Sequence, residues 1–301
     1  MGVMRVDCHQ HLWPEQLVEA LRCRAEPPRL AGWTLSLRGE RPFVVTPRDH
    51  DRADRALREQ IAGTGRALVS MSSPLGIEHL PPEQSAGLLQ AWHAGATALG
   101  DPYRVWAAVN VVEPDLADLR EVLAQDRVVG LQLPATALAD VAAVERMGDV
   151  LEVLAQAGRP LLVHPGPVAV HGPGSPSWWP ALVPYVSQLH AAWHAWHVAG
   201  RPSYPTLRVA FVALAGLAPL HHERLAARGG ALGQIDPNTY YETSSYGPRA
   251  VDATVRVVGV DALVHGSDRP YAEHTDPGLG DAFTHAMFVT NPARLLSGEP
   301  S

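Results

Sequence analysis

The 301-residue sequence contains no lysine, so all 24 of its basic residues are arginine. The absence of lysine excludes Schiff-base catalysis, a phosphate-binding P-loop and any metal bridge built on a lysine side chain. Cysteine is nearly absent as well. Cys8 and Cys23 are too few to form a disulfide framework in a chain of this length, so we expect a reducing compartment, the cytoplasm.

The sequence also lacks basic runs and long apolar runs. The formal net charge is −7, so we expect no nucleic-acid partner. No apolar stretch is long enough to span a bilayer, and the N-terminus reaches charged and polar residues at once, so we expect neither a membrane partner nor a signal peptide. Hydrophobic residues make up 46% of the chain, which is enough for one large core.

Eight short apolar segments alternate with longer helical segments along the whole chain. Most are continuous apolar runs, which is typical of parallel strands buried on both faces. Their ranges are 5–12, 67–73, 104–111, 128–135, 160–167, 207–216, 239–246 and 263–271. This alternation predicts a (β/α)8 TIM barrel as one α/β domain over residues 1–301, with a doubly wound open sheet as the alternative.

Two segments are longer than a barrel loop requires. Residues 25–47 and 166–181 are rich in proline, glycine and tryptophan, and they follow the first and fifth predicted strands. Because barrel active sites lie at the carboxyl ends of the strands, we predict that both insertions border the site. Between the first two strands, residues 46–63 predict one helix, with Thr46 as its N-cap and a proline in its first turn.

Two histidines lie in the first predicted strand. Residues two apart in a strand face the same side, so His9 and His11 would present two imidazoles to one point. Neutral imidazole is a common ligand of zinc and similar ions. The pair alone is a weak signal, because neighbouring histidines are often polar loop residues.

Two further ligand-type residues end later strands. His164 closes a very apolar run, and Asp268 follows the last predicted strand. Each alone has a plainer interpretation. His164 could be a buried histidine that is hydrogen-bonded to a backbone carbonyl, and Asp268 could be a loop residue that caps the next helix. In a closed barrel, however, the tops of strands one, five and eight surround one opening, so the four residues could form a His3Asp site.

Together these motifs resemble the amidohydrolase superfamily, in the amidohydrolase-2 branch that contains aminocarboxymuconate-semialdehyde decarboxylase and related aromatic-acid decarboxylases and hydrolases. The resemblance covers nearly the whole chain and is carried by the segments DCHQH, LLVHPGP, LVHGSDRPY and NPARLL. It implies a TIM barrel in which His9, His11, His164 and Asp268 bind one divalent metal ion. Zn2+ is implied first, with Mn2+ and Fe2+ as alternatives, and the missing lysine leaves no bridge for a second ion.

The chain departs from this family at the sixth strand, where relatives usually carry a catalytic histidine in a segment like HxGG. Leu214 takes that place, and residues 207–220 contain no histidine. We interpret His221 and His222 as surface helix residues, although either could fold back into the site. Asp268 is therefore the expected catalytic residue.

Aromatic and polar residues near the predicted strand ends indicate the shape of the substrate. Aromatic side chains with one or two arginines suit a flat small molecule that bears a carboxylate. The expected contacts are Trp13, Trp33, His171, Tyr246, Arg249 and Arg269. His190, His194 and His197 have helical spacing instead, which indicates a half-buried amphipathic helix at the contact of a homodimer, with a second metal site as the alternative.

Three functions are open at this point. With Asp268 as a proton acceptor, one metal ion predicts hydrolysis of a C–N or C–O bond in a small cyclic amide, ester or lactone. A non-oxidative decarboxylase of an aromatic or enoic acid is the alternative, in which Asp268 protonates carbon. Leu214 also leaves open a barrel that binds a ligand without turnover.

Overall fold

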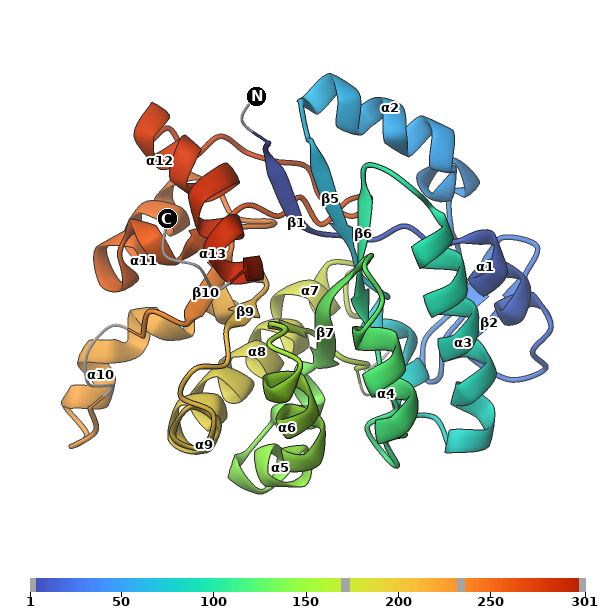
Figure 1. The fold of residues 1–301 in the computed structure, drawn as a ribbon, viewed down its shortest axis with the longest axis horizontal. Coiled ribbons are helices and arrows are strands. Elements are labelled where there is room, and N and C mark those ends of the chain that lie inside the picture. The colour runs from blue at the N-terminus through green and yellow to red at the C-terminus, as the bar shows by residue number, and fades with distance from the viewer. Residues whose placement is uncertain (1–3, 169–173, 232–235, 298–301) are drawn as a thin grey trace.

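A computed structural model describes residues 4–168, 174–231 and 236–297. Eight parallel strands form one sheet whose spatial order follows the chain (Figure 1). They are β1 (Val6–Gln10), β5 (Arg66–Val69), β6 (Tyr103–Ala107), β7 (Val128–Pro134), β8 (Leu161–His164), β9 (Val209–Phe211), β10 (Thr239–Glu242) and β11 (Leu263–Val264). Each predicted strand range overlaps one of them.

The chain after β11 returns to β1 and nearly closes the barrel. The N–H of Cys8 donates to the carbonyl of His265 at 2.8 Å, and the N–H of Asp268 donates to the carbonyl of His9 at 2.9 Å. In an open doubly wound sheet, these two segments would lie at different places in the strand order without such bonds. The predicted TIM barrel is therefore confirmed, and the open sheet is excluded.

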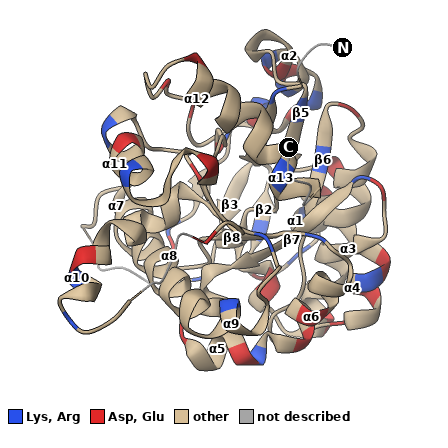
Figure 2. Cartoon of the chain, turned by 60° about the vertical axis from the view of Figure 1, so that its left-hand side comes forward, with Lys and Arg blue, Asp and Glu red and all other residues tan. Residues whose placement is uncertain are grey.

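Helices connect the strands and lie outside them (Figure 1). They are α1 (Glu15–Arg22), α2 (Arg52–Ala62), α3 (Pro82–Ala98), α4 (Leu116–Leu123), α5 (Val141–Arg146), α6 (Gly148–Gln156), α7 (Trp179–Leu182), α8 (Pro184–Ala195), α9 (Arg201–Ser203), α10 (His222–Ala226), α11 (Pro248–Val258), α12 (Asp281–His285) and α13 (Asn291–Ser297). Acidic and basic residues are interspersed on outer helices such as α4, α10 and α11 (Figure 2). Within the described residues, none of the helices combines the length and apolar character needed to cross a bilayer.

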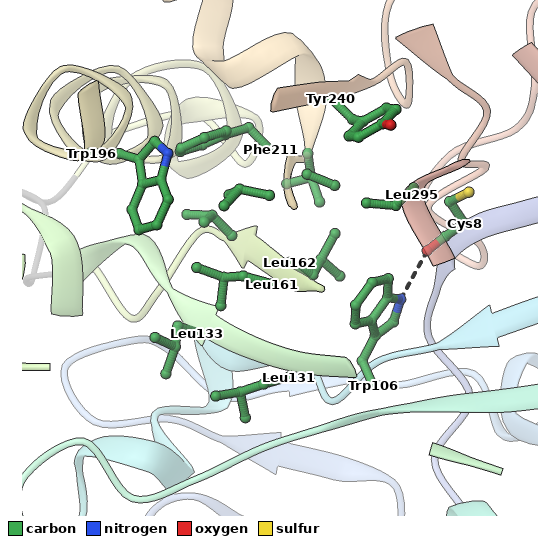
Figure 3. Packing of buried hydrophobic residues seen from close by; sticks show 14 of the residues in the cluster. Cys8, Trp106, Leu131, Leu133, Leu161, Leu162, Trp196, Phe211, Tyr240 and Leu295 are labelled. Atoms are coloured by element: carbon green, nitrogen blue, oxygen red, sulfur yellow. Dashed lines mark hydrogen bonds between the residues drawn. The ribbon is translucent and has the colours of Figure 1, made fainter. Parts of the chain in front are cut away.

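The core joins the barrel strands to the helices around them (Figure 3). Trp106 of β6 is fully buried, and its indole N–H donates to the carbonyl of Cys8 at 3.0 Å. Glycine is required beside it at Gly130, because an added Cβ would overlap the Trp106 ring and the carbonyl of Pro160. The indole is therefore fixed between strands that lie far apart in the sequence.

The insertion after β1 folds into a small antiparallel sheet of β2 (Arg29–Ala31), β3 (Thr34–Ser36) and β4 (Phe43–Val44). The helix predicted over 46–63 begins later than expected. Thr46 makes no side-chain cap and precedes a short 3-10 turn, whereas the carboxylate of Asp51 accepts the N–H of Asp54 at 2.8 Å. This cap satisfies an N–H of the first turn, so α2 begins at Arg52.

Two buried histidines help to tie the loops to the barrel. The Nδ1 atom of His50 accepts the N–H of Trp13 at 3.1 Å, and Nε2 of His93 accepts the N–H of Ala108 at 3.1 Å. An imidazole nitrogen that accepts a hydrogen bond must carry a free lone pair. Burial agrees with this, because it lowers the pKa of His50 to about 3 and that of His93 to about 4.

We expect the free energy of unfolding of the metal-free protein to fall as the pH is lowered from 7 to 5. A histidine whose pKa lies below its unfolded value of about 6.5 takes up more of a proton in this range in the unfolded chain than in the folded one. Burial of Asp7 and Glu242 acts in the opposite direction, because it raises their pKa to about 7 and about 8. Among the described residues, histidines with a lowered pKa outnumber carboxyl groups with a raised one.

Urea denaturation at several pH values, after exhaustive dialysis against a chelator, measures this dependence. A free energy of unfolding that stays constant or rises toward pH 5 would contradict it.

Candidate metal centre

Four ligand-type side chains converge at the carboxyl ends of the strands. One ligand atom from each of His9, His11, His164 and Asp268 lies within 4.8 Å of the others. The three imidazole centroids are 4.9 to 5.0 Å apart, and Nε2 of His11 lies 3.2 Å from Oδ1 of Asp268. The histidines are buried while the Asp268 side chain is 21% exposed, so solvent reaches the centre from the side of Asp268.

Backbone carbonyls orient two of the three imidazoles. Nδ1 of His11 lies 3.0 Å from the carbonyl of Ser70, and Nδ1 of His164 lies 2.8 Å from that of Pro165. A carbonyl can only accept a hydrogen bond, so Nδ1 carries the proton in both rings, and each Nε2 lone pair is free for a metal.

Burial sets the protonation states that metal binding requires. It lowers the pKa of His9 to about 3 and that of His164 well below its usual range. Burial alone would raise the pKa of Asp268, but the neighbouring imidazoles of His11, His9 and His164 lower it overall. The centre therefore offers the neutral imidazoles of His9 and His164 beside a carboxylate.

This set of donors fits one divalent ion. Three imidazole nitrogens and one carboxylate oxygen are ligands typical of zinc and of related first-row metals. Both ring nitrogens of His9 are buried and accept or donate no hydrogen bond among the described residues. A buried polar atom without a partner is costly, and an ion at the centre would satisfy Nε2.

A buried polar network lies beneath the centre. Arg55 of α2 is fully buried and donates to the carbonyl of His11 at 2.7 Å. Glu59, also fully buried, accepts from the guanidinium of Arg269 at 2.9 Å. Arg269 also bonds to Glu273 at 2.9 Å, so two carboxylates of the protein already engage the guanidinium that was expected to bind substrate.

Among the other expected substrate contacts, Trp13 is fixed by hydrogen bonds. Its indole N–H donates to the hydroxyl of Ser72 at 3.0 Å, and Ser72 also bonds to Tyr271. The Tyr271 ring lies 5.4 Å from that of His11. Trp33 is half-buried, and its ring is parallel to that of His50 at 6.2 Å.

Two of the three remaining expected contacts lie among the described residues. Tyr246 packs against the core, and Arg249 is exposed on α11. His171 lies outside the described residues. Neither histidine after β9 is seen at the centre: the ring of His221 lies 5.0 Å from that of His190 on α8, and His222 is 45% exposed.

Three site residues were not anticipated individually from the sequence. Tyr271 ends the motif LVHGSDRPY, and a search for aromatic residues next to the ligands would have found it. Tyr185 is the second residue of α8, and burial together with the negative charges of Glu40 and Asp268 raises its pKa. Glu242 ends β10, where a carboxyl group in a buried strand was the available signal.

The chain after β9 follows an unusual path where relatives of the resembled family would carry histidine. The five residues 213–217 all have positive φ, between 48° and 62°. Such a left-handed turn is costly for residues with a Cβ, and it is tolerated where the surroundings hold it firmly. Leu214 is fully buried in the main apolar cluster.

No model of a protein family matches the sequence, and neither does any of the curated proteins. Solved structures do match. The IDCase of Metarhizium anisopliae, in its apo form, is 17% identical with a TM-score of 0.79, covering 99% of this chain and 98% of that one. An amidohydrolase II is also 17% identical, with a TM-score of 0.75 and coverage of 97% and 99%.

A third structure is a variant of the 5-carboxyvanillate decarboxylase of Novosphingobium aromaticivorans with bound manganese and 3-methoxy-4-hydroxy-5-nitrobenzoic acid. It is 15% identical with a TM-score of 0.71, covering 98% of this chain and 97% of that one. At such identities the likeness concerns the fold. This chain therefore has the TIM-barrel fold of the amidohydrolase-2 structures, which match it over nearly its full length.

Proposed function

We propose that this protein is a mononuclear metal-dependent decarboxylase that removes CO2 from a small aromatic or enoic acid without an oxidant. The observation that carries the proposal is the convergence of His9, His11, His164 and Asp268 on one point, open to solvent on the side of Asp268. Several similar structures are named as decarboxylases, which supports this reaction. Hydrolysis, the main expectation from the sequence, has less support.

The side chains around the opening suit a flat acid. The Tyr271 ring lies 5.4 Å from that of His11, and the indole of Trp13 donates to the hydroxyl of Ser72. Aromatic walls with few polar groups are typical of sites for small planar ligands. A divalent ion held by the four ligand residues would supply a positive charge that binds and polarises substrate oxygens. Zn2+ is the first candidate for this ion, with Mn2+ and Fe2+ as alternatives.

Asp268 is the proposed proton carrier, because it is the exposed member of the four. It first takes up a proton from the solvent that reaches it and then delivers this proton to the substrate carbon that bears the carboxylate. The bond between that carbon and the carboxylate then breaks, its electron pair stays on the carbon system, and CO2 leaves. The product carries hydrogen where the substrate carried the carboxylate, so no redox partner is required.

Hydrolysis of a small cyclic amide, ester or lactone is the second candidate. It is favoured by one specific observation: Asp268 lies where it could accept a proton from water, 3.2 Å from the His11 ligand nitrogen. No histidine is needed for this role.

Isotope labelling separates the two candidates. The metal-loaded protein is incubated in D2O with hydroxybenzoates and small enoic acids, and in H2(18)O with lactones and cyclic imides. We expect CO2 release with one deuterium at the carbon that lost the carboxylate. Incorporation of (18)O into a ring-opened product, without CO2 release from any acid, would replace decarboxylation by hydrolysis. Binding without turnover across both sets would support a non-catalytic barrel.

A further inference from the structure

The third imidazole of the centre has an unusual partner. Nδ1 of His9 faces Oε2 of Glu242 at 3.4 Å, whereas the other two histidines face backbone carbonyls. Among the described residues, His9 is the only basic group within ion-pair distance of Glu242. The Nε2 atom of His9 points the other way, toward Asp268.

Glu242 is held in one place from several sides. Its Oε2 accepts the hydroxyl of Ser244 at 2.7 Å and the N–H of Ala213 at 3.2 Å, and its Oε1 accepts the N–H of Ser244. The side chain is fully buried. It also fills the space beside Gly266, where an added Cβ would overlap its carboxyl group and Cγ.

We infer that Glu242 is a positioning residue for the metal ligand His9. Its carboxyl group faces Nδ1 at 3.4 Å and thereby favours the ring orientation in which Nδ1 carries the proton and Nε2 is turned toward the ion. Glu242 lies behind His9 and away from solvent, so it does not reach the substrate. Through the N–H of Ala213 the same carboxylate also holds the start of the left-handed turn over residues 213–217.

The negative charge of Glu242 should also increase the stabilisation of the protein by a bound metal ion. A buried carboxylate without a cation is unfavourable, and an ion at the centre, one imidazole away, would supply the missing positive charge. The metal should therefore stabilise the protein partly through Glu242. This inference rests on the proposed metal centre but not on the identity of the reaction.

The test compares Glu242→Gln with the matched control Glu78→Gln. Glu78 is also a fully buried carboxyl group, held by the hydroxyl of Ser73, and it makes no hydrogen bond or ion pair with any of the four ligand residues. Zinc affinity is measured by competition with a chromophoric chelator, and the melting temperature is measured with and without zinc. We expect Glu242→Gln to bind zinc about 10–100-fold more weakly and to gain less thermal stability from it. Glu78→Gln should retain the affinity of the unmodified protein.

Two further variants distinguish a role in metal binding from a general folding defect. Glu242→Asp keeps the charge and should recover part of the affinity, while Gly266→Ala should weaken zinc binding by displacing the carboxylate. A purely structural role would lower the melting temperatures of metal-free and zinc-bound protein alike and leave the zinc-induced gain unchanged, which would overturn the inference. The inference would also be overturned if Glu242→Gln bound zinc as tightly as the protein without the substitution. If the unmodified protein itself bound no zinc, manganese or iron(II), the metal centre would fail as well, whereas metal binding without decarboxylation would remove only the proposed reaction.

Discussion

Asp268→Asn is expected to keep a bound metal ion while turnover falls by about 10²–10⁴-fold, the usual effect of removing a positioned proton-transfer group. The amide retains the shape of the side chain and one oxygen that can face the ion, but it cannot carry the proton. The three imidazoles remain, with centroids 4.9 to 5.0 Å apart. Metal affinity should therefore fall less steeply than the rate.

The measurement is elemental analysis of the purified variant together with its rate on the substrate found by the isotope panel. One tightly held ion per chain is expected in both proteins. Asp261→Asn serves as a control, since this aspartate is 77% exposed and pairs only with Arg294 among the contacts described. Near-normal turnover in a metal-loaded Asp268→Asn variant would show that another group carries the proton.

Arg55→Met should lower the free energy of unfolding by about 3–5 kcal/mol, as expected when one member of a buried charged network is removed. The guanidinium is fully buried and donates to the carbonyls of His11 and Asp49 at 2.7 and 2.9 Å. It also bonds to the side chain of Gln10. Its loss leaves these acceptors without a partner and leaves Glu59 with Arg269 as its only cation in the network.

Urea denaturation of metal-free protein measures this effect apart from metal binding. Arg256→Met is the matched control: its guanidinium pairs with Asp252 on the exposed face of α11, where a surface ion pair contributes less than about 1 kcal/mol. Equal losses in the two variants would mean that the buried network does not stabilise the fold in the way proposed.

The barrel and the convergence of its four ligand-type residues could be predicted from the sequence because the signals are local. A strand buried on both faces is a short apolar run wherever it occurs, and all eight such runs became strands of the barrel. His9, His11, His164 and Asp268 follow or end such runs. Strand ends at one face of a closed barrel meet by geometry, so their residue types and positions were sufficient to bring them together.

The start of α2 illustrates a local competition that the sequence left open. Thr46 and Asp51 are both good N-cap residues, separated by a few positions. The short turn at Pro47–His50 buries His50 against Trp13, and this tertiary contact leaves Asp51 as the residue that caps the helix.

The partners of charged side chains were decided by the tertiary structure alone. Arg269 follows a ligand in the sequence, which favoured substrate binding, yet its guanidinium lies between Glu59 and Glu273, one of them more than two hundred positions away. Glu242 gave no periodic or motif signal, and its place behind His9 depends on β10 and β1 being brought together by barrel closure. Hydrophobic periodicity is encoded within a few residues, whereas the pairing of buried charges depends on three-dimensional proximity, which this sequence specifies only through the completed barrel.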